Sequence, residues 1–133
     1  MEKKNPKTIN TTALAYIGDA VYEIYVRKHV IEGGESHVDM LHKKAVCYVR
    51  ADAQAKALKT LMTGFLSEEE AALARRARNH KSASKPKNAD PVTYKLATAF
   101  EAIIGYLYLS EQTQRMKEII AKAFEIIEGE EHE

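Results

Sequence analysis

The sequence predicts an all-α protein, and three observations carry this prediction. Apolar residues recur every three or four positions along most of the 133 residues, no segment alternates apolar and polar residues as a half-buried strand would, and glycine, proline or capping residues separate the apolar runs. The length fits one domain with one hydrophobic core, and the sequence has no internal repeat. We therefore expect a single helical bundle.

The first two helices are predicted from apolar spacing and from their end signals. Apolar side chains at helical spacing cover residues 13–32, and the glycine pair at 33–34 supplies a stop. Ser36 with Asp39 resembles an N-terminal capping pair. It predicts a long second helix that can be broken near Asp52.

The middle of the chain carries the clearest capping signal. Ser67 and Glu70 form a capping box, and the helix they start has acids in its first turn and arginines in its last, which suits the helix dipole. Residues 79–89 are rich in Asn, Lys and Ser, contain a proline and cannot build a core, so we expect an exposed loop. Asp90 and Pro91 then start another helix.

Two apolar runs complete the bundle. The helix that starts at Pro91 includes the run at 92–109, and a last helix over about 112–128 carries one apolar stripe and ends at Gly129. The expected division of the chain is a polar lead-in at 1–12, a helical domain at 13–128 and an acidic tail at 129–133.

Composition limits the kind of protein. A formal net charge of +1 gives no overall attraction to nucleic acid, so any electrostatic argument rests on how charge is distributed. The single cysteine, Cys47, excludes an intrachain disulfide and a zinc site of several thiolates, and no pair of the five histidines has a ligand spacing with it. The polar start, MEKKNPKTINTT, does not resemble a signal peptide or anchor. We expect a cytoplasmic protein without a membrane partner.

Two carboxylates stand in the apolar stretch ALAYIGDAVYEIYV at 13–26. Asp19 and Glu23 are its only ionisable side chains apart from tyrosines, and their spacing places them on one face of a helix. Because the stretch is apolar on almost every side, we expect it to be buried on almost every side. An unpaired carboxylate there would cost roughly several kcal/mol, so a basic partner, a set of donors, a shifted pKa or a bound cation must compensate it.

The run VTYKLATAFEAIIGYLYL at 92–109 repeats this pattern. Glu101 is its only acid, and its only base, Lys95, lies about 120° around the helix and is a poor partner. The face of Glu101 carries small and hydroxyl-bearing residues that let another helix approach, and Gly18 beside Asp19 offers similar closeness. The run is long enough to span a membrane, but its polar residues favour a buried helix of a soluble protein.

We hypothesise that Asp19 and Glu101 converge to hold a divalent cation, with Mg²⁺ as the expected ion. Proteins bind Mg²⁺ through one or two carboxylates, and the ion keeps several waters and takes phosphate oxygens. The alternative is a structural polar contact between packed helices, since buried acids are often simply hydrogen-bonded.

A basic segment precedes the Glu101 helix. Residues 71–89 contain six lysines and arginines and no acid, which suits contacts with a phosphate backbone. The alternative is a solvated loop after a helix whose end is decorated with arginines. The candidate RNA-binding residues are Arg75, Arg76, Arg78, Asn79, His80, Lys81, Lys85 and Lys87.

Two stretches resemble motifs of a known family. LAYIGDAVYE at 14–23 resembles the ribonuclease III signature, and ATAFEAIIGYLYL at 97–109 resembles its partner motif. The order of the two motifs, with a basic stretch between them, is more specific than either motif alone, and the resemblance covers residues 11–128. The chain is most similar to the mini-ribonuclease III proteins, which have the catalytic domain without a double-stranded-RNA-binding domain.

The resemblance implies site residues. Asp19 lies at the position of the signature's metal-binding aspartate, and Glu101 at that of the second motif's metal-binding glutamate; both are the implied catalytic residues. The signature's preceding carboxylate is replaced by Ala15, and the aspartate expected three residues before Glu101 by Thr98. Water, the Thr98 hydroxyl or Glu23 are the candidates to fill these places.

The resemblance also implies a function. It implies a homodimeric, double-strand-specific endoribonuclease of the EC 3.1.26 type that uses Mg²⁺, or Mn²⁺ as a substitute, and leaves 5′-phosphate and 3′-hydroxyl ends. The implied role is maturation of ribosomal RNA precursor (23S rRNA) in ribosome biogenesis, with a ribosomal protein as a partner that presents the substrate. The alternatives are a non-cleaving RNA-binding or ribosome-assembly factor of the same fold and, more distantly, a helical protein-interaction domain.

Overall fold

The computed structural model describes residues 5–80 and 90–131, with side chains described as far as Gly129. Within these ranges the chain is helical and contains no strand, which confirms the predicted all-α class. The elements are a 3-10 helix, η1 (Pro6–Thr8), and the α-helices α1 (Thr11–Glu32), α2 (Val38–Val49), α3 (Ala51–Leu61), α4 (Glu68–Asn79), α5 (Pro91–Leu109) and α6 (Thr113–Glu131).

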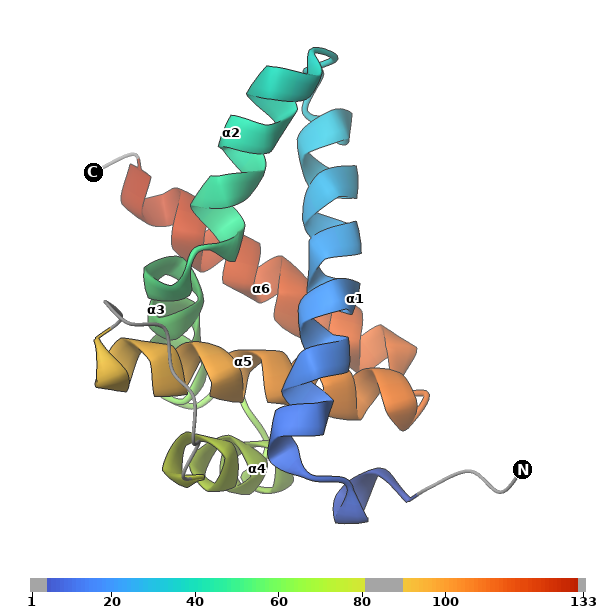
Figure 1. Cartoon of the computed structure of the whole chain (residues 1–133), viewed down its shortest axis with the longest axis vertical. Coiled ribbons are helices and arrows are strands. Elements are labelled where there is room, and N and C mark those ends of the chain that lie inside the picture. The colour runs from blue at the N-terminus through green and yellow to red at the C-terminus, as the bar shows by residue number, and fades with distance from the viewer. Residues whose placement is uncertain (1–4, 81–89, 132–133) are drawn as a thin grey trace.

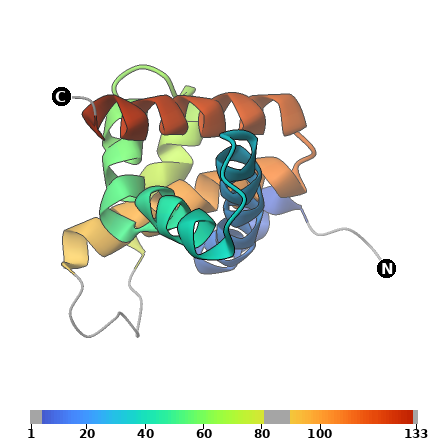
Figure 2. The ribbon, with the colours of Figure 1, turned by 90° about the horizontal axis from the view of Figure 1, so that it is seen from above.

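Helix α5 is the centre of the bundle. It runs across the middle of Figure 1, where α1 crosses it and α4 lies below it, and it packs most extensively against α1, α3 and α4. In Figure 2, α6 lies along one side of the molecule, and α2 lies toward the other. Nearly every residue of α5 from 96 to 107 is buried, as its apolar sequence predicts. None of the helices described is both long and apolar enough to cross a membrane.

Two glycines let α1 and α5 cross in backbone contact. A Cβ atom added at Gly18 would lie 1.8 Å from the carbonyl oxygen of Glu101, and one added at Gly105 would lie 1.9 Å from that of Leu14. No side chain fits at such distances, so both positions require glycine. The crossing confirms the expected close approach and sets Asp19 next to the helix that carries Glu101.

The predicted start of the second helix is wrong. The N-cap of α2 is His37, which makes no side-chain capping hydrogen bond, and Ser36 lies outside the helix. The Glu35 carboxylate instead accepts hydrogen bonds from the backbone amides of Ser36 and His37, at 3.1 and 3.2 Å. An ionised acceptor one residue earlier thus takes the role expected of Ser36. The predicted break is confirmed, with Arg50 between α2 and α3 rather than Asp52.

The remaining helix starts agree with the sequence. The capping box of α4 is complete, with Ser67 and Glu70 bonded reciprocally at 2.9 and 3.1 Å. The Asp90 carboxylate accepts from the Thr93 amide at 3.2 Å at the start of α5. The end predicted for the last helix is wrong, because α6 continues through Gly129 to Glu131. A glycine within a helix costs only about 1 kcal/mol, and here it does not outweigh helix formation.

Candidate active site

The expected burial of the first helix on almost every side is wrong. Helix α1 packs one face against α5 and leaves the other on the surface, where Tyr16 is 83% exposed and Ile24 is 66% exposed. Asp19 lies on the exposed part of this helix, one residue after the buried Gly18. Its carboxylate is therefore open to solvent, at the edge of the α1–α5 crossing.

Glu101 faces Asp19 from α5. Its side chain is half-buried, and its carboxyl group lies within hydrogen-bonding reach of the Asp19 carboxylate. Burial and the neighbouring Asp19 raise the pKa of Glu101 to about 9. The two acids that the sequence predicts to converge are therefore in contact, and at neutral pH Glu101 retains its proton unless a cation replaces it.

A third polar side chain reaches the pair from α3. Gln54 is 2% exposed, and its Nε2 donates to the Val49 carbonyl at 3.0 Å. Its amide also lies close to Glu101 and, against the larger effects of burial and Asp19, lowers the pKa of that acid. Sequence reasoning did not select Gln54. The sequence shows a single amide side chain among the alanines and leucines of 51–61. This pattern does not reveal which neighbouring helix the amide faces.

The carboxylate pair suits a magnesium ion. The ion pairs formed by residues 5–80 and 90–129 include none to Asp19 or Glu101. No group of three or more His, Cys, Asp or Glu residues in the described chain could hold a metal. Two carboxylates, with water filling the remaining positions, are a donor set that Mg²⁺ accepts and that zinc sites rarely use.

The two additional candidates have partners of their own. Glu23 forms an ion pair with Arg27 on the next turn of α1, at 3.1 Å. The Thr98 hydroxyl donates to the Tyr94 carbonyl at 3.0 Å, as hydroxyls within helices often do, although its oxygen can still accept a hydrogen bond. Their part in the site remains a prediction.

The basic segment is described only in part. Arg75 and Arg76 are exposed and Arg78 is half-buried on the last turns of α4, while Asn79 ends this helix and His80 follows it. Arg75 and Arg78, three positions apart, share a helix face, whereas Arg76 faces a pocket beside Lys7, Glu69 and Tyr106. The predicted contacts of Lys81, Lys85 and Lys87 lie outside the described residues.

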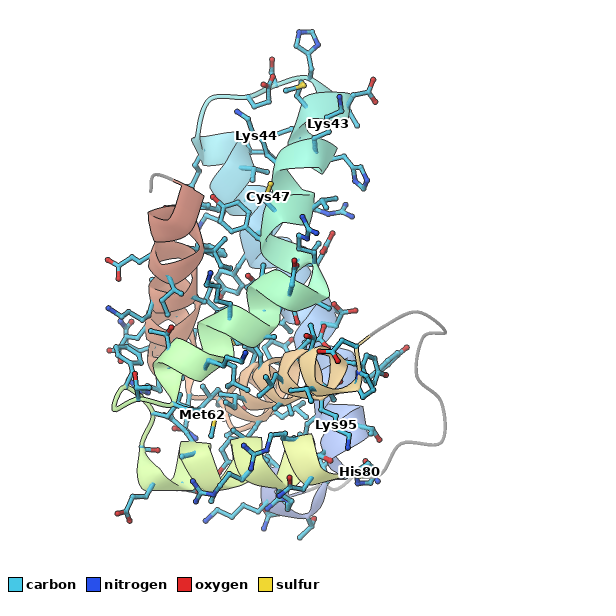
Figure 3. The ribbon with its side chains drawn as sticks, turned by 90° about the vertical axis from the view of Figure 1, so that its left-hand side faces the viewer. Lys43, Lys44, Cys47, Met62, His80 and Lys95 are labelled. Carbon is cyan, nitrogen blue, oxygen red and sulfur yellow. The ribbon has the colours of Figure 1, made fainter. Side chains whose placement is uncertain are left out.

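The labelled polar side chains lie in two separate parts of the molecule. In Figure 3, His80 and Lys95 lie in the lower half, whereas Lys43, Lys44 and Cys47 lie toward the upper end of α2. The Cys47 thiol donates to the Lys43 carbonyl at 3.7 Å, a contact typical of a cysteine within a helix.

Comparison with known proteins places this geometry in a class. Residues 12–112 match the family model described as the ribonuclease III domain. The chain is 50% identical to the mini-ribonuclease 3 of Brevibacillus brevis, covering 96% of this chain and 94% of that one. It is 45% identical to that of Enterococcus faecalis (86% and 87%) and 45% identical to that of Symbiobacterium thermophilum (96% and 98%).

A solved structure agrees with the sequence comparison. The crystal structure of a Fusobacterium nucleatum protein superposes with a TM-score of 0.79 at 31% identity, covering 92% of this chain and 98% of that one. The domain match and the coverage of most of both chains in these comparisons lead to one conclusion. The chain belongs to the mini-ribonuclease III family.

Proposed function

We propose that this protein is an endoribonuclease that cleaves double-stranded RNA by Mg²⁺-dependent phosphodiester hydrolysis and leaves 5′-phosphate and 3′-hydroxyl ends. One observation carries the proposal: two carboxylates from separate helices meet at a solvent-accessible crossing, without a basic partner among the described residues. A stability role would favour pairing each acid with a base, as this chain does elsewhere. Membership of a ribonuclease family supports the same chemistry.

Asp19 and Glu101 would hold the magnesium ion, or manganese as a substitute. Bound there, the cation would supply a Lewis acid for the scissile phosphate and lower the pKa of its water. Because Asp19 lies on the exposed face of α1, a large substrate could reach the site. Glu101 has to release its proton when it becomes a ligand, so binding is expected to tighten as the pH rises.

The end of α4 and the segment after it would hold the RNA. Arg75 and Arg78 share a face and would contact the phosphate backbone without reading bases. Lys81, Lys85 and Lys87 add charge to the same segment of the sequence.

A homodimer would place one such site on each RNA strand. The outer face of α1 and the start of α2 carry large apolar side chains that a monomer would leave in water, and a second copy is the occupant we propose. These side chains are Tyr16, Ile24, Ile31, Val38 and Met40. We further propose that the substrate is a ribosomal RNA precursor and that a ribosomal protein presents it. The proposed location is the cytoplasm.

Cleavage of a generic RNA duplex by Asp19→Asn and Glu101→Gln tests the assignment. Each variant is expected to lose activity by at least about 100-fold, as when a transition-state electrostatic interaction is removed, while it folds and binds RNA as before. Titration with Mg²⁺ should activate the wild type from an EDTA-treated baseline. Undiminished turnover in either variant contradicts the proposal.

The chief alternative is a non-cleaving RNA-binding or assembly factor, which the absence of carboxylates at Ala15 and Thr98 favours. It predicts RNA affinity without Mg²⁺-dependent cleavage in the assay above. The variant Arg75→Ala with Arg78→Ala should weaken binding and reduce the salt slope by about one for each phosphate that the protein no longer neutralises. Lys117→Ala, at an exposed position on α6, is the control. Absence of any RNA affinity in the wild type would favour an interaction domain.

A further inference from the structure

Gln54 is a buried amide that the ribonuclease motifs do not include. Its side chain lies between two features of the fold, the carbonyl of Val49 at the end of α2 and the carboxyl group of Glu101 on α5. With 2% exposure it is nearly as buried as the apolar core around it. The amide is therefore hydrogen-bonded to the α2–α3 break at the Val49 carbonyl and lies close to the Glu101 carboxyl group.

The break between α2 and α3 makes this link available. Arg50 has extended backbone angles, φ −65° and ψ 150°, which interrupt the helical hydrogen bonds. The Ala53 amide, which would bond the Val49 carbonyl in a continuous helix, is bonded instead to the Asp52 carboxylate at 2.9 Å. The Val49 carbonyl is thereby left for Gln54, and it holds one N–H of the amide in a fixed direction.

The other end of the amide argues against a purely structural role. The Oε1 atom of Gln54 is buried and has no hydrogen-bond partner among the described residues. A buried acceptor without a partner costs about 1–3 kcal/mol, and an apolar side chain of the same length would avoid that cost. The bond to the Val49 carbonyl accounts for the nitrogen of this amide but not for its buried oxygen, and such an exception calls for a further explanation.

We propose that Gln54 is a positioning residue of the Asp19–Glu101 site: its amide, fixed by the Val49 carbonyl, donates to the Glu101 carboxylate and holds it in the orientation that binds the divalent cation. The inference rests on the proposed function. It adds to the two acids a third side chain, from a third helix, and it connects the geometry of the site to the break between α2 and α3.

The first test compares Gln54→Met with the wild type. Methionine keeps the length and the burial of the side chain but cannot donate to Glu101. Loss of an outer partner of a metal ligand typically costs 10–100-fold, so we expect the Mn²⁺ dissociation constant, measured by calorimetry, to rise by about 10-fold or more. We also expect kcat for duplex RNA to fall, its KM to change by less than about 2-fold, and higher Mg²⁺ concentrations to recover part of the loss.

Thr11→Val is the matched control. In the part of the chain that the structure describes, Thr11 is the other residue with a buried polar atom that lacks a partner, its hydroxyl, and it lies two turns before Asp19 on α1. Its replacement should leave Mn²⁺ affinity and kcat unchanged. Thermal unfolding in EDTA should give midpoints for both variants within a few degrees of the wild type. If Gln54→Met lost Mn²⁺ affinity only to the extent that it lost thermal stability, the proposal would be overturned.

The same measurements separate this inference from the proposed function. If the wild type and Asp19→Asn bind Mn²⁺ equally, the proposed function fails. If Asp19→Asn loses the ion while Gln54→Met matches the wild type in Mn²⁺ affinity and kcat, only the role of Gln54 fails.

A measurement on the wild-type protein covers the case in which Gln54→Met does not fold. The side-chain amide resonances of Gln54 should shift when Mg²⁺ saturates the site, because the Glu101 carboxylate that accepts from them changes its charge state. The exposed amides of Gln112 and Gln114 serve as internal references. Unmoved Gln54 resonances at saturating Mg²⁺ would falsify the positioning role.

Discussion

Two glutamates of this protein, the buried Glu70 and the half-buried Glu101, have opposite surroundings. Glu70 is 6% exposed and accepts two hydrogen bonds from the Arg115 guanidinium, at 2.8 and 3.0 Å, and one from the Ser67 amide at 2.9 Å. Burial raises the pKa of Glu70, but Arg115 and Ser67 outweigh it and hold the pKa below its usual range. Glu101 has a second acid as its neighbour, and burial and that acid both raise its pKa.

The difference is between a carboxylate with a cationic partner and a carboxyl group without one among the described residues. Around Glu70 the chain supplies a planar guanidinium, which also donates to the Phe65 carbonyl at 2.7 Å and joins α6 to the start of α4. Around Glu101 it supplies one nearby amide, that of Gln54, and a second acid, Asp19. Carboxyl groups with unfavourable neighbours are concentrated at functional sites, and this tendency supports the proposed cation site.

The largest effect is expected from breaking the satisfied pair. Arg115→Met leaves the Glu70 carboxylate buried without its cation, and such losses cost about 3–5 kcal/mol in fully buried pairs. Because Arg115 is itself partly exposed, we expect a value near the lower end, about 3 kcal/mol. Urea unfolding measures it, and Arg75→Met on the exposed face of α4 is the control. A loss below about 1 kcal/mol, the range of a surface ion pair, would contradict this view of Glu70.

A smaller effect of opposite sign is expected from relieving the unsatisfied pair. Glu101→Gln removes a group that loses its proton less easily in the folded state than in the unfolded state. In EDTA at pH 8 we expect its melting temperature to rise by about 3–6 °C, which for a domain of this size corresponds to about 1 kcal/mol. Mg²⁺ should stabilise the wild type by mass action and leave Glu101→Gln nearly unaffected.

The pH dependence of stability in the same variant tests the raised pKa of Glu101. With a pKa of about 9 folded and 4.5 unfolded, Glu101 binds more proton in the folded state between these values, so its contribution makes the metal-free protein less stable as the pH rises from about 4.5 to 9. Urea midpoints at pH 5, 7 and 9 in EDTA should decline more steeply for the wild type than for Glu101→Gln. Parallel pH profiles would show that the pKa of Glu101 is not raised in the folded protein.

Local signals in the sequence predicted local structure well, as Ser67 and Glu70 illustrate. The two members of the capping box lie three positions apart, so their reciprocal hydrogen bonds follow from helix geometry alone. The partner of the same Glu70 carboxylate, Arg115, lies 45 positions away and could not be predicted. Ser36 shows the reverse error, since a capping pattern was present but the neighbouring Glu35 carboxylate offered a stronger acceptor to the same amides.

The sequence by itself determined the helical class, the acids in apolar helices and the glycines that permit a close crossing, because these depend on periodicity and on residue size over a few turns. Only the tertiary structure decided which face of α1 meets water, that Arg115 satisfies Glu70, and that Gln54 reaches Glu101. Those outcomes depend on which helices pack together and at what rotation, and contacts between residues tens of positions apart leave no mark in local spacing.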